Sequence, residues 1–192
     1  METSDLRDIA QKRYDDFVDA LREMVNVDCG SYTPDGVNVI ADLCQARFER
    51  GGWAVERMRH EPDEGQEQLG DLVIGRLEGI GSKRVLMIGH TDTVFDTGTV
   101  AERPFATEGD RAFGPGVTDM KGGLLTGFFA VEVLQAAGFE DFGRVTYICN
   151  PDEEIGSPWS RDVIRAEAAN ADVALVLEGA RENGDIVSAR KG

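Results

Sequence analysis

The chain has 192 residues, of which 41% are hydrophobic, so it can bury the core of one ordinary domain and is not wholly disordered. Its formal net charge of −16 argues against nucleic acid or an anionic membrane as a partner, because both require a basic face. The sequence has three cysteines without CxxC spacing, and it contains neither an apolar signal-peptide segment nor a stretch of membrane-spanning length. These features predict a soluble, cytoplasmic protein with reduced thiols.

The N-terminal part of the chain is predicted to be helical. Apolar residues recur at helical spacing from about residue 5 to 27, which predicts one amphipathic helix. A loop over 28–35 separates it from a second helix. That helix is expected to end at Gly51-Gly52, where glycine can adopt the left-handed conformation of a C-cap. Both helices are interpreted as structural packing.

Extended segments follow these helices. Strands are predicted over residues 53–58, 71–77 and 84–89. A glycine-containing connection of the hairpin type joins the last two. The acidic stretch 60–70 is a predicted loop, and its His60 is interpreted as a solvated histidine rather than a metal ligand. Residues 95–116 form a long irregular stretch, and such loops tend to be functional or mobile.

The second half alternates helix and strand. A mostly buried helix is predicted from Asp119 to Gly138, and its interior glycines indicate close packing against another backbone. The elements predicted after it are a strand over 144–149, a helix from a Ser157-Pro158 cap to about Ala169, a buried strand over 172–177 and one short strand within 181–192. This alternation predicts an α/β fold with a largely parallel sheet.

Ionisable residues follow the ends of three predicted strands, and an aspartate begins the glycine-rich helix. They are His90 and Asp92, Glu153 and Glu154, Glu178, and Asp119. In a parallel sheet the carboxyl ends of the strands share one edge, where ligands bind. Carboxylates gathered there would repel one another unless a cation lies among them. The simpler alternative is a loop histidine hydrogen-bonded to an aspartate, with acidic caps on separate loops.

The residue types predict a divalent metal site. One imidazole with several carboxylates suits zinc, with cobalt or manganese as alternatives. Asp119 could bridge a pair of ions about 3.5–4 Å apart through its two carboxylate oxygens. The sequence has no GxSxG, GxxxxGK[ST], complete GxGxxG or HExxH motif, so the chemistries that those motifs carry are not favoured.

Four motifs resemble those of a known enzyme family. In order and spacing, GHTDTV (89–94), GPGVTDMKGG (114–123), DEEIGS (152–157) and LEGA (177–180) are similar to the motifs of the dinuclear zinc exopeptidases and deacylases. That family includes glutamate carboxypeptidase, acetylornithine deacetylase, succinyl-diaminopimelate desuccinylase and aminoacylase. The SRDVI sequence after GSPW resembles the glutamate carboxypeptidase branch most closely. The resemblance implies a three-layer α/β sandwich, in which helices flank a mixed, mostly parallel central sheet.

The resemblance also implies a role for each site residue. The metal ligands would be His90 and Glu178 on one zinc ion, Glu154 on the second and Asp119 between both. Asp92 would orient His90 through the other ring nitrogen. Glu153 would be the general base that takes a proton from the attacking water and delivers it to the departing amine. The peptide after the bridging aspartate is cis in several relatives, so Asp119–Met120 is a candidate for a cis peptide bond.

A complete dinuclear site of this type needs five ligands, and this chain offers four. Family members take the fifth from a histidine that follows an inserted lid and dimerisation domain. Residues 1–192 are therefore expected to be the N-terminal part of a metallopeptidase catalytic domain, without the lid and dimerisation domain and without the C-terminal catalytic half. This fragment is expected to be inactive alone, and the complete protein is expected to be a homodimer.

The predicted function is zinc-dependent hydrolysis of an amide or peptide bond in an N-acyl amino acid or small peptide, as in carboxypeptidases and deacylases. One alternative is a non-catalytic metal-binding or interaction module on the same fold. Another is a structural fragment that self-associates through an exposed sheet edge. Glu153 favours the enzyme, because a simple binding site has no need of a base.

Overall fold

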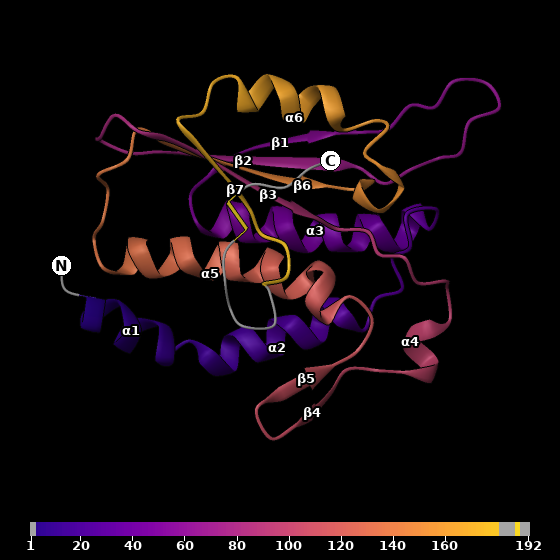
Figure 1. Cartoon of the computed structure of the whole chain (residues 1–192), viewed down its shortest axis with the longest axis horizontal. Helices are drawn as coiled ribbons and strands as arrows, with labels where there is room; N and C mark the ends of the chain where they lie inside the picture. The colour runs from indigo at the N-terminus through magenta and orange to yellow at the C-terminus, as the bar shows by residue number, and fades with distance from the viewer. Residues whose placement is uncertain (1–2, 181–186, 189–192) are drawn as a thin grey trace.

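A computed structural model describes residues 3–180 and 187–188, which form a five-stranded mixed sheet with helices on both faces (Figure 1). The strands, in their order across the sheet, are β1 (Ala54–Met58), β2 (Leu72–Glu78), β6 (Arg144–Asn150), β3 (Arg84–His90) and β7 (Val173–Val176). Both β1 and β6 pair antiparallel with β2, while β3 pairs parallel with both β6 and β7. Among these strands β2 alone runs against the others, which confirms the predicted mixed, mostly parallel sheet.

Helices form a layer on each side of the sheet. One face is covered by α6 (Arg161–Ala168) and the other by α3 (Pro34–Arg50) and α5 (Gly122–Ala136), with α1 (Thr3–Gln11) and α2 (Tyr14–Val25) beyond α5 (Figure 1). The larger apolar core lies on the α3 and α5 side and includes Phe48, Phe128 and Tyr147. A smaller core on the α6 side includes Leu86 and Ile148. The predicted three-layer sandwich is confirmed, and no helix in the described part is long and apolar enough to cross a membrane.

The apolar spacing of α3 determines which side of that helix packs on the sheet. Its buried residues are Val37, Ile40, Ala41, Cys44 and Phe48, which recur every three or four positions and so lie along one face. The helix ends at Arg50, and Gly52 has a φ of +76°, as expected of a glycine in the left-handed region after a helix. The second predicted helix is therefore confirmed with its stop signal.

The predicted hairpin between β2 and β3 is wrong, because β6 lies between these two strands. The connection after β2 instead forms backbone hydrogen bonds with the residues that directly precede β6. There Gly79 N–H donates to the Gly143 carbonyl at 3.0 Å, and Gly81 N–H donates to the Phe142 carbonyl at 2.9 Å. The prediction paired β2 with β3 because few residues separate them in the sequence. The actual neighbour of both strands, β6, begins more than fifty residues after β3, and almost all of its residues are buried in the centre of the sheet.

The single helix predicted over residues 5–27 is two helices in the structure. Lys12 and Arg13 separate α1 from α2, and the Arg13 N–H donates to the Ala10 carbonyl three residues earlier, which ends the regular α-helical pattern. Its guanidinium lies 3.0 Å from Glu132 on α5. Because α1 and α2 both contact α5, the break allows each helix to turn an apolar face toward the same neighbour.

Three other predicted elements differ in detail. The irregular stretch 95–116 contains α4 (Thr99–Glu102) and a hairpin of β4 (Ala106–Glu108) and β5 (Arg111–Phe113). The helix predicted from Ser157 begins only at Arg161, because the Asp152 carboxylate accepts the backbone N–H groups of Trp159 and Ser160 and holds the chain in a turn before it. The strand β7 is exposed rather than buried, because it is an outermost strand of the described sheet. The strand predicted within 181–192 falls outside the described residues, apart from 187–188.

The glycines of α5 allow close packing, as the sequence predicts. A Cβ atom on Gly123 would collide with the Leu177 carbonyl oxygen, and one on Gly127 would lie 2.5 Å from the Leu177 side chain. Leu177 directly precedes Glu178, so these glycines determine how closely α5 approaches the segment that carries Glu178.

Gly123→Ala should therefore destabilise the protein, although in a helix interior alanine is normally about 1 kcal/mol more favourable than glycine. Overpacking against the Leu177 carbonyl is expected to lower the free energy of unfolding by about 1–3 kcal/mol. Chemical denaturation would measure the change. The exposed Ala130→Gly variant on the same helix reports the ordinary propensity cost alone, and a stabilised Gly123→Ala protein would contradict the packing argument.

Candidate metal centre

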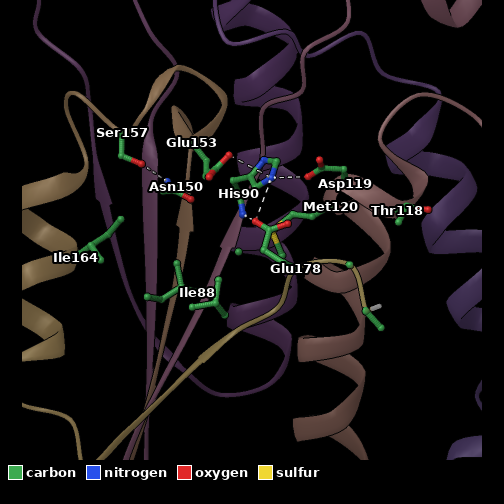
Figure 2. Close-up of a pocket in the computed structure, with 14 residues that line it drawn as sticks. Ile88, His90, Thr118, Asp119, Met120, Asn150, Glu153, Ser157, Ile164 and Glu178 are labelled. Atoms are coloured by element: carbon green, nitrogen blue, oxygen red, sulfur yellow. Dashed lines mark hydrogen bonds and ion pairs between the residues drawn. The ribbon is translucent and has the colours of Figure 1, made fainter. Parts of the chain in front are cut away.

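The carboxyl ends of three parallel strands meet at one edge of the sheet (Figure 2). β3 ends at His90, which pairs in register with Asn150 at the end of β6. Ile88 of β3 pairs with Val176 of β7, and the chain then continues through Leu177 to Glu178. The expectation that these strand ends share one edge is met by the pairing.

His90 lies at the centre of a group of acidic side chains, and its own side chain is only 1% exposed. Its Nε2 lies 3.0 Å from Asp119 Oδ1, 3.5 Å from Glu178 Oε1 and 3.9 Å from Glu153 Oε2 (Figure 2). Within the described residues two groups could hold a metal, with candidate ligand atoms within 4.8 Å of one another: His90 with Asp119 and Glu154, and His90 with Glu153 and Glu178. The imidazole is common to both groups.

Asp119 lies on a tight turn, Val117–Lys121, that leads into α5. The Asp119–Met120 peptide bond is cis, as the family resemblance implies. The buried Met120 side chain lies against β3, where its Sδ accepts a hydrogen bond from His90 N–H at 3.2 Å. The turn thus contacts the end of β3 through Met120 while the Asp119 carboxylate faces the His90 ring.

Asp92 lies behind the imidazole and is fully buried. His90 Nδ1 is 2.9 Å from the Asp92 backbone carbonyl and 3.3 Å from its carboxylate oxygen Oδ1. The same carboxylate accepts the backbone N–H groups of Glu153 and Glu154, each at 3.2 Å. One carboxylate therefore contacts the ring of His90 and also the backbone of the two glutamates.

The electrostatics of the cluster favour a positive charge at its centre. Burial lowers the pKa of His90, but the hydrogen bond and charge of Asp92, together with the charge of Glu178, outweigh burial and raise this pKa to about 9. Burial and the neighbouring Asp119 raise the pKa values of the Glu154 and Glu178 carboxyl groups. The metal-free site is therefore expected to keep a proton on His90 at neutral pH, in the place where a cation would relieve the repulsion.

The donor set fits a divalent ion of the zinc type. One imidazole nitrogen and several carboxylate oxygens lie close enough to share an ion, and these are ligand types that zinc accepts. His60, the other histidine, is not in either group. It is partly buried rather than solvated, because its Nδ1 accepts the Leu69 N–H at 3.0 Å and its ring packs edge-on against Trp159.

Two further residues at the site were not singled out by the sequence. Asp152 holds the turn after β6 by accepting the backbone N–H groups of Trp159 and Ser160. Ser31, in the loop before α3, donates its hydroxyl to Asp92 Oδ2 at 2.6 Å. The DEEIGS motif contains Asp152 and could have drawn attention to it, whereas Ser31 lies in a loop 61 positions away from its partner.

Comparison with known proteins assigns the chain to a family. A model of the peptidase family M20/M25/M40 matches residues 86–190, more than half of the chain. The chain belongs to this family. It is 35% identical over 161 residues to carboxypeptidase G2 of Pseudomonas sp. (strain RS-16), covering 84% of this chain and 38% of the relative. The acetylornithine deacetylase of Myxococcus xanthus is 27% identical, covering 84% of this chain and 41% of the relative.

Solved structures share the fold at lower sequence identity. Human carnosine dipeptidase 1 superposes with a TM-score of 0.78 at 20% identity, covering 93% of this chain and 41% of that protein. The family predicted from the four motifs is confirmed by these matches, and the superposition supports the predicted sandwich fold. The chain spans about two fifths of the length of these relatives.

The charge on His90 predicts how the stability of the metal-free protein depends on pH. Because its pKa is raised from 6.5 to about 9 on folding, the protonated ring stabilises the folded state below pH 6.5. This contribution, on the order of 3 kcal/mol, is lost as the pH rises toward 9. Chemical denaturation in the presence of a chelator, between pH 6.5 and 9, would measure the loss.

Two matched variants test this assignment, since the chain has two histidines. His90→Gln should flatten the stability profile over that range, because the titrating ring is gone. His60→Gln should retain the loss. Equal slopes for the wild type and His90→Gln would contradict the role of the acidic cluster.

Proposed function

We propose that this chain carries the N-terminal part of the catalytic domain of a metal-dependent hydrolase that cleaves amide or peptide bonds, as carboxypeptidases and deacylases do. One observation carries the proposal: in a chain of this peptidase family, a buried imidazole faces four acidic side chains at the edge of the sheet. Members of the family depend on a metal, typically zinc. Zinc is therefore the proposed ion, with cobalt or manganese as alternatives.

The proposed ligands divide between two ions that share Asp119. His90 and Glu178 would hold the first ion and Glu154 the second, with the two oxygens of Asp119 between them. Of the two groups around His90, one contains Asp119 and Glu154 and the other contains Glu178, which supports placing Glu154 and Glu178 on different ions. When bound, the ions would activate a water molecule and polarise the carbonyl of the scissile bond.

Glu153 is the proposed general base, and Asp92 is proposed to orient His90. The Glu153 side chain is about half exposed, so it can reach a substrate, while its backbone is held by Asp92. It would take the proton of the attacking water and deliver it to the departing amine. The backbone carbonyl and the buried carboxylate of Asp92, 2.9 and 3.3 Å from Nδ1, would together hold the ring so that Nε2 faces the proposed ligands.

Two cavities meet at Asp119 and are proposed to hold the two sides of the substrate. One of about 690 Å³ is lined in part by His90, Asn150 and Ile164, and the other, of about 560 Å³, in part by Phe113 and Glu154. A substrate lying across both would present its amide bond to the ligand cluster. An N-acyl amino acid or small peptide is the proposed class, supported by relatives named as carboxypeptidase, deacetylase and dipeptidase.

The second ion is proposed to need a fifth ligand beyond the described residues. His60 is engaged by Leu69 and Trp159, so it is a poor candidate. The relatives are more than twice as long as the matched segment, which supports a catalytic domain completed by a later part of the protein. By analogy with the family, a lid and dimerisation domain and a homodimeric complete protein are part of this proposal.

The 192-residue chain should bind at most one divalent ion tightly and hydrolyse little or no substrate. Four ligands cannot complete two sites of three ligands each, even with Asp119 shared. Calorimetric titration with zinc would give the stoichiometry, and an amidase assay on N-acyl amino acids would give the activity. Robust hydrolysis by this chain alone would contradict the missing-ligand argument, and no zinc binding would contradict the proposed site.

Glu153→Gln separates the enzyme from a non-catalytic metal-binding module. In a protein that contains the complete site, we expect kcat to fall by about 10²–10⁴-fold, the usual contribution of a general base, while metal content stays unchanged. Metal analysis and steady-state kinetics would measure both. Glu154→Gln on the neighbouring residue is the control, since it should lose metal as well as activity. Unchanged turnover in Glu153→Gln would assign the base elsewhere.

A further inference from the structure

The Asp92 carboxylate is held by a residue from a distant part of the chain. Ser31 lies in the loop between α2 and α3, is buried, and donates its hydroxyl to Asp92 Oδ2 at 2.6 Å. This is the shortest of the contacts that the carboxylate makes with its described neighbours. We propose that Ser31 is a positioning residue of the metal centre, acting through Asp92 on His90 and on the Glu153–Glu154 segment. This inference rests on the metal-dependent function proposed above.

The contacts of Asp92 explain why one hydroxyl can matter to several ligands. Oδ1 faces His90 Nδ1 at 3.3 Å and the Glu153 N–H at 3.2 Å, while Oδ2 accepts from Ser31 and from the Glu154 N–H at 3.2 Å. Each oxygen of a carboxylate offers two acceptor positions, and here each oxygen has two neighbours. Without the hydroxyl, Oδ2 would keep one long bond, and the carboxylate could rotate.

Rotation of Asp92 would disturb both sides of the centre at once. The His90 ring would lose its contact with Oδ1 and would be held on that side by the Asp92 backbone carbonyl, 2.9 Å from Nδ1, so its Nε2 would be less well aimed at the acidic cluster. The backbone of Glu153 and Glu154 would lose a shared acceptor, and with it the position of the proposed base and of one ligand. Groups that orient metal ligands in this way typically change metal affinity by about 10–100-fold when removed.

Independent contacts hold the loop that carries Ser31. Thr93 N–H donates to the Cys29 carbonyl at 2.9 Å, and Lys121 Nζ donates to the Val27 carbonyl at 3.0 Å. The Asp28 carboxylate accepts N–H groups from residues 98 and 100 at 2.8 and 2.9 Å. Removal of the Ser31 hydroxyl should therefore leave the loop in place and act on Asp92 alone.

The experiment compares metal affinity with the stability of the metal-free protein. Ser31→Ala should weaken cobalt or zinc binding by about 10–100-fold in calorimetric titrations. It should also change the visible absorption spectrum of the cobalt form, which reports ligand geometry. Thr33→Ala is the matched control: its hydroxyl lies on the same loop but, within the described residues, pairs with the exposed Thr97 hydroxyl at 3.2 Å rather than with Asp92, so affinity should be unchanged.

A second pair of variants separates loss of the hydroxyl from a general folding defect. Ser31→Thr and Ser31→Val have side chains of similar shape and differ in the hydroxyl, so the first should keep most of the affinity and the second should lose it. Histidine NMR signals of the metal-free protein add a readout that needs no ion. His90 should shift in Ser31→Val relative to Ser31→Thr, while His60 should stay the same in both.

The outcomes distinguish this inference from the proposed function. If the wild type binds metal and Ser31→Ala and Ser31→Val bind it equally tightly with the same cobalt spectrum, Ser31 is a structural residue only and the inference is wrong. If Ser31→Val is less stable than Ser31→Thr but binds metal equally tightly, Ser31 is again a structural residue only and the inference is wrong. If the wild type itself binds no metal, the proposed function fails and the inference fails with it.

Discussion

The contacts of the buried Asp92 carboxylate join the parts of the chain that make up the candidate site. The carboxylate is the meeting point of segments that are distant in the sequence: the end of β3, the turn after β6 and the loop before α3. A buried carboxylate is costly unless donors surround it, so each donor lowers the cost of burial and is in turn fixed by it. The strands bring the proposed ligands to one edge of the sheet, and this carboxylate contacts both the His90 ring and the Glu153–Glu154 backbone there.

The acidic cluster in front of His90 is unfavourable in the metal-free protein. The raised pKa values of Glu154 and Glu178 express the cost of placing carboxylates together in a partly buried site. A proton on His90 offsets part of this repulsion, and a divalent ion would offset more of it. Most other acidic residues in the described part of the chain are exposed to solvent, so the net charge of −16 is weak evidence for a metal site. The position of these few carboxylates around His90 is stronger evidence.

The sequence predicted those features that depend on local pattern. Apolar runs located the strands, and the ionisable residues that follow them, such as His90 and Glu178, lie at one edge because parallel strands end together. It failed where distant contacts decide: β6 inserts between β2 and β3, and Arg13 breaks a helix at the point where it meets Glu132. Ser31 could not be found in this way, because a serine in a loop carries no pattern until its partner is known.

The two sides of the site are supported unequally. Glu153 and Glu154 follow the central strand β6 and are held by Asp92, whereas Glu178 follows β7, which has one partner strand in the described part of the chain and is exposed along its length. What holds Glu178 is the segment before it: Leu177 N–H donates to Ile88, and the glycine face of α5 packs against the Leu177 backbone. The position of this proposed ligand therefore depends on the small residues of a helix more than on its own strand, which explains why glycines occur where helix propensity alone would disfavour them.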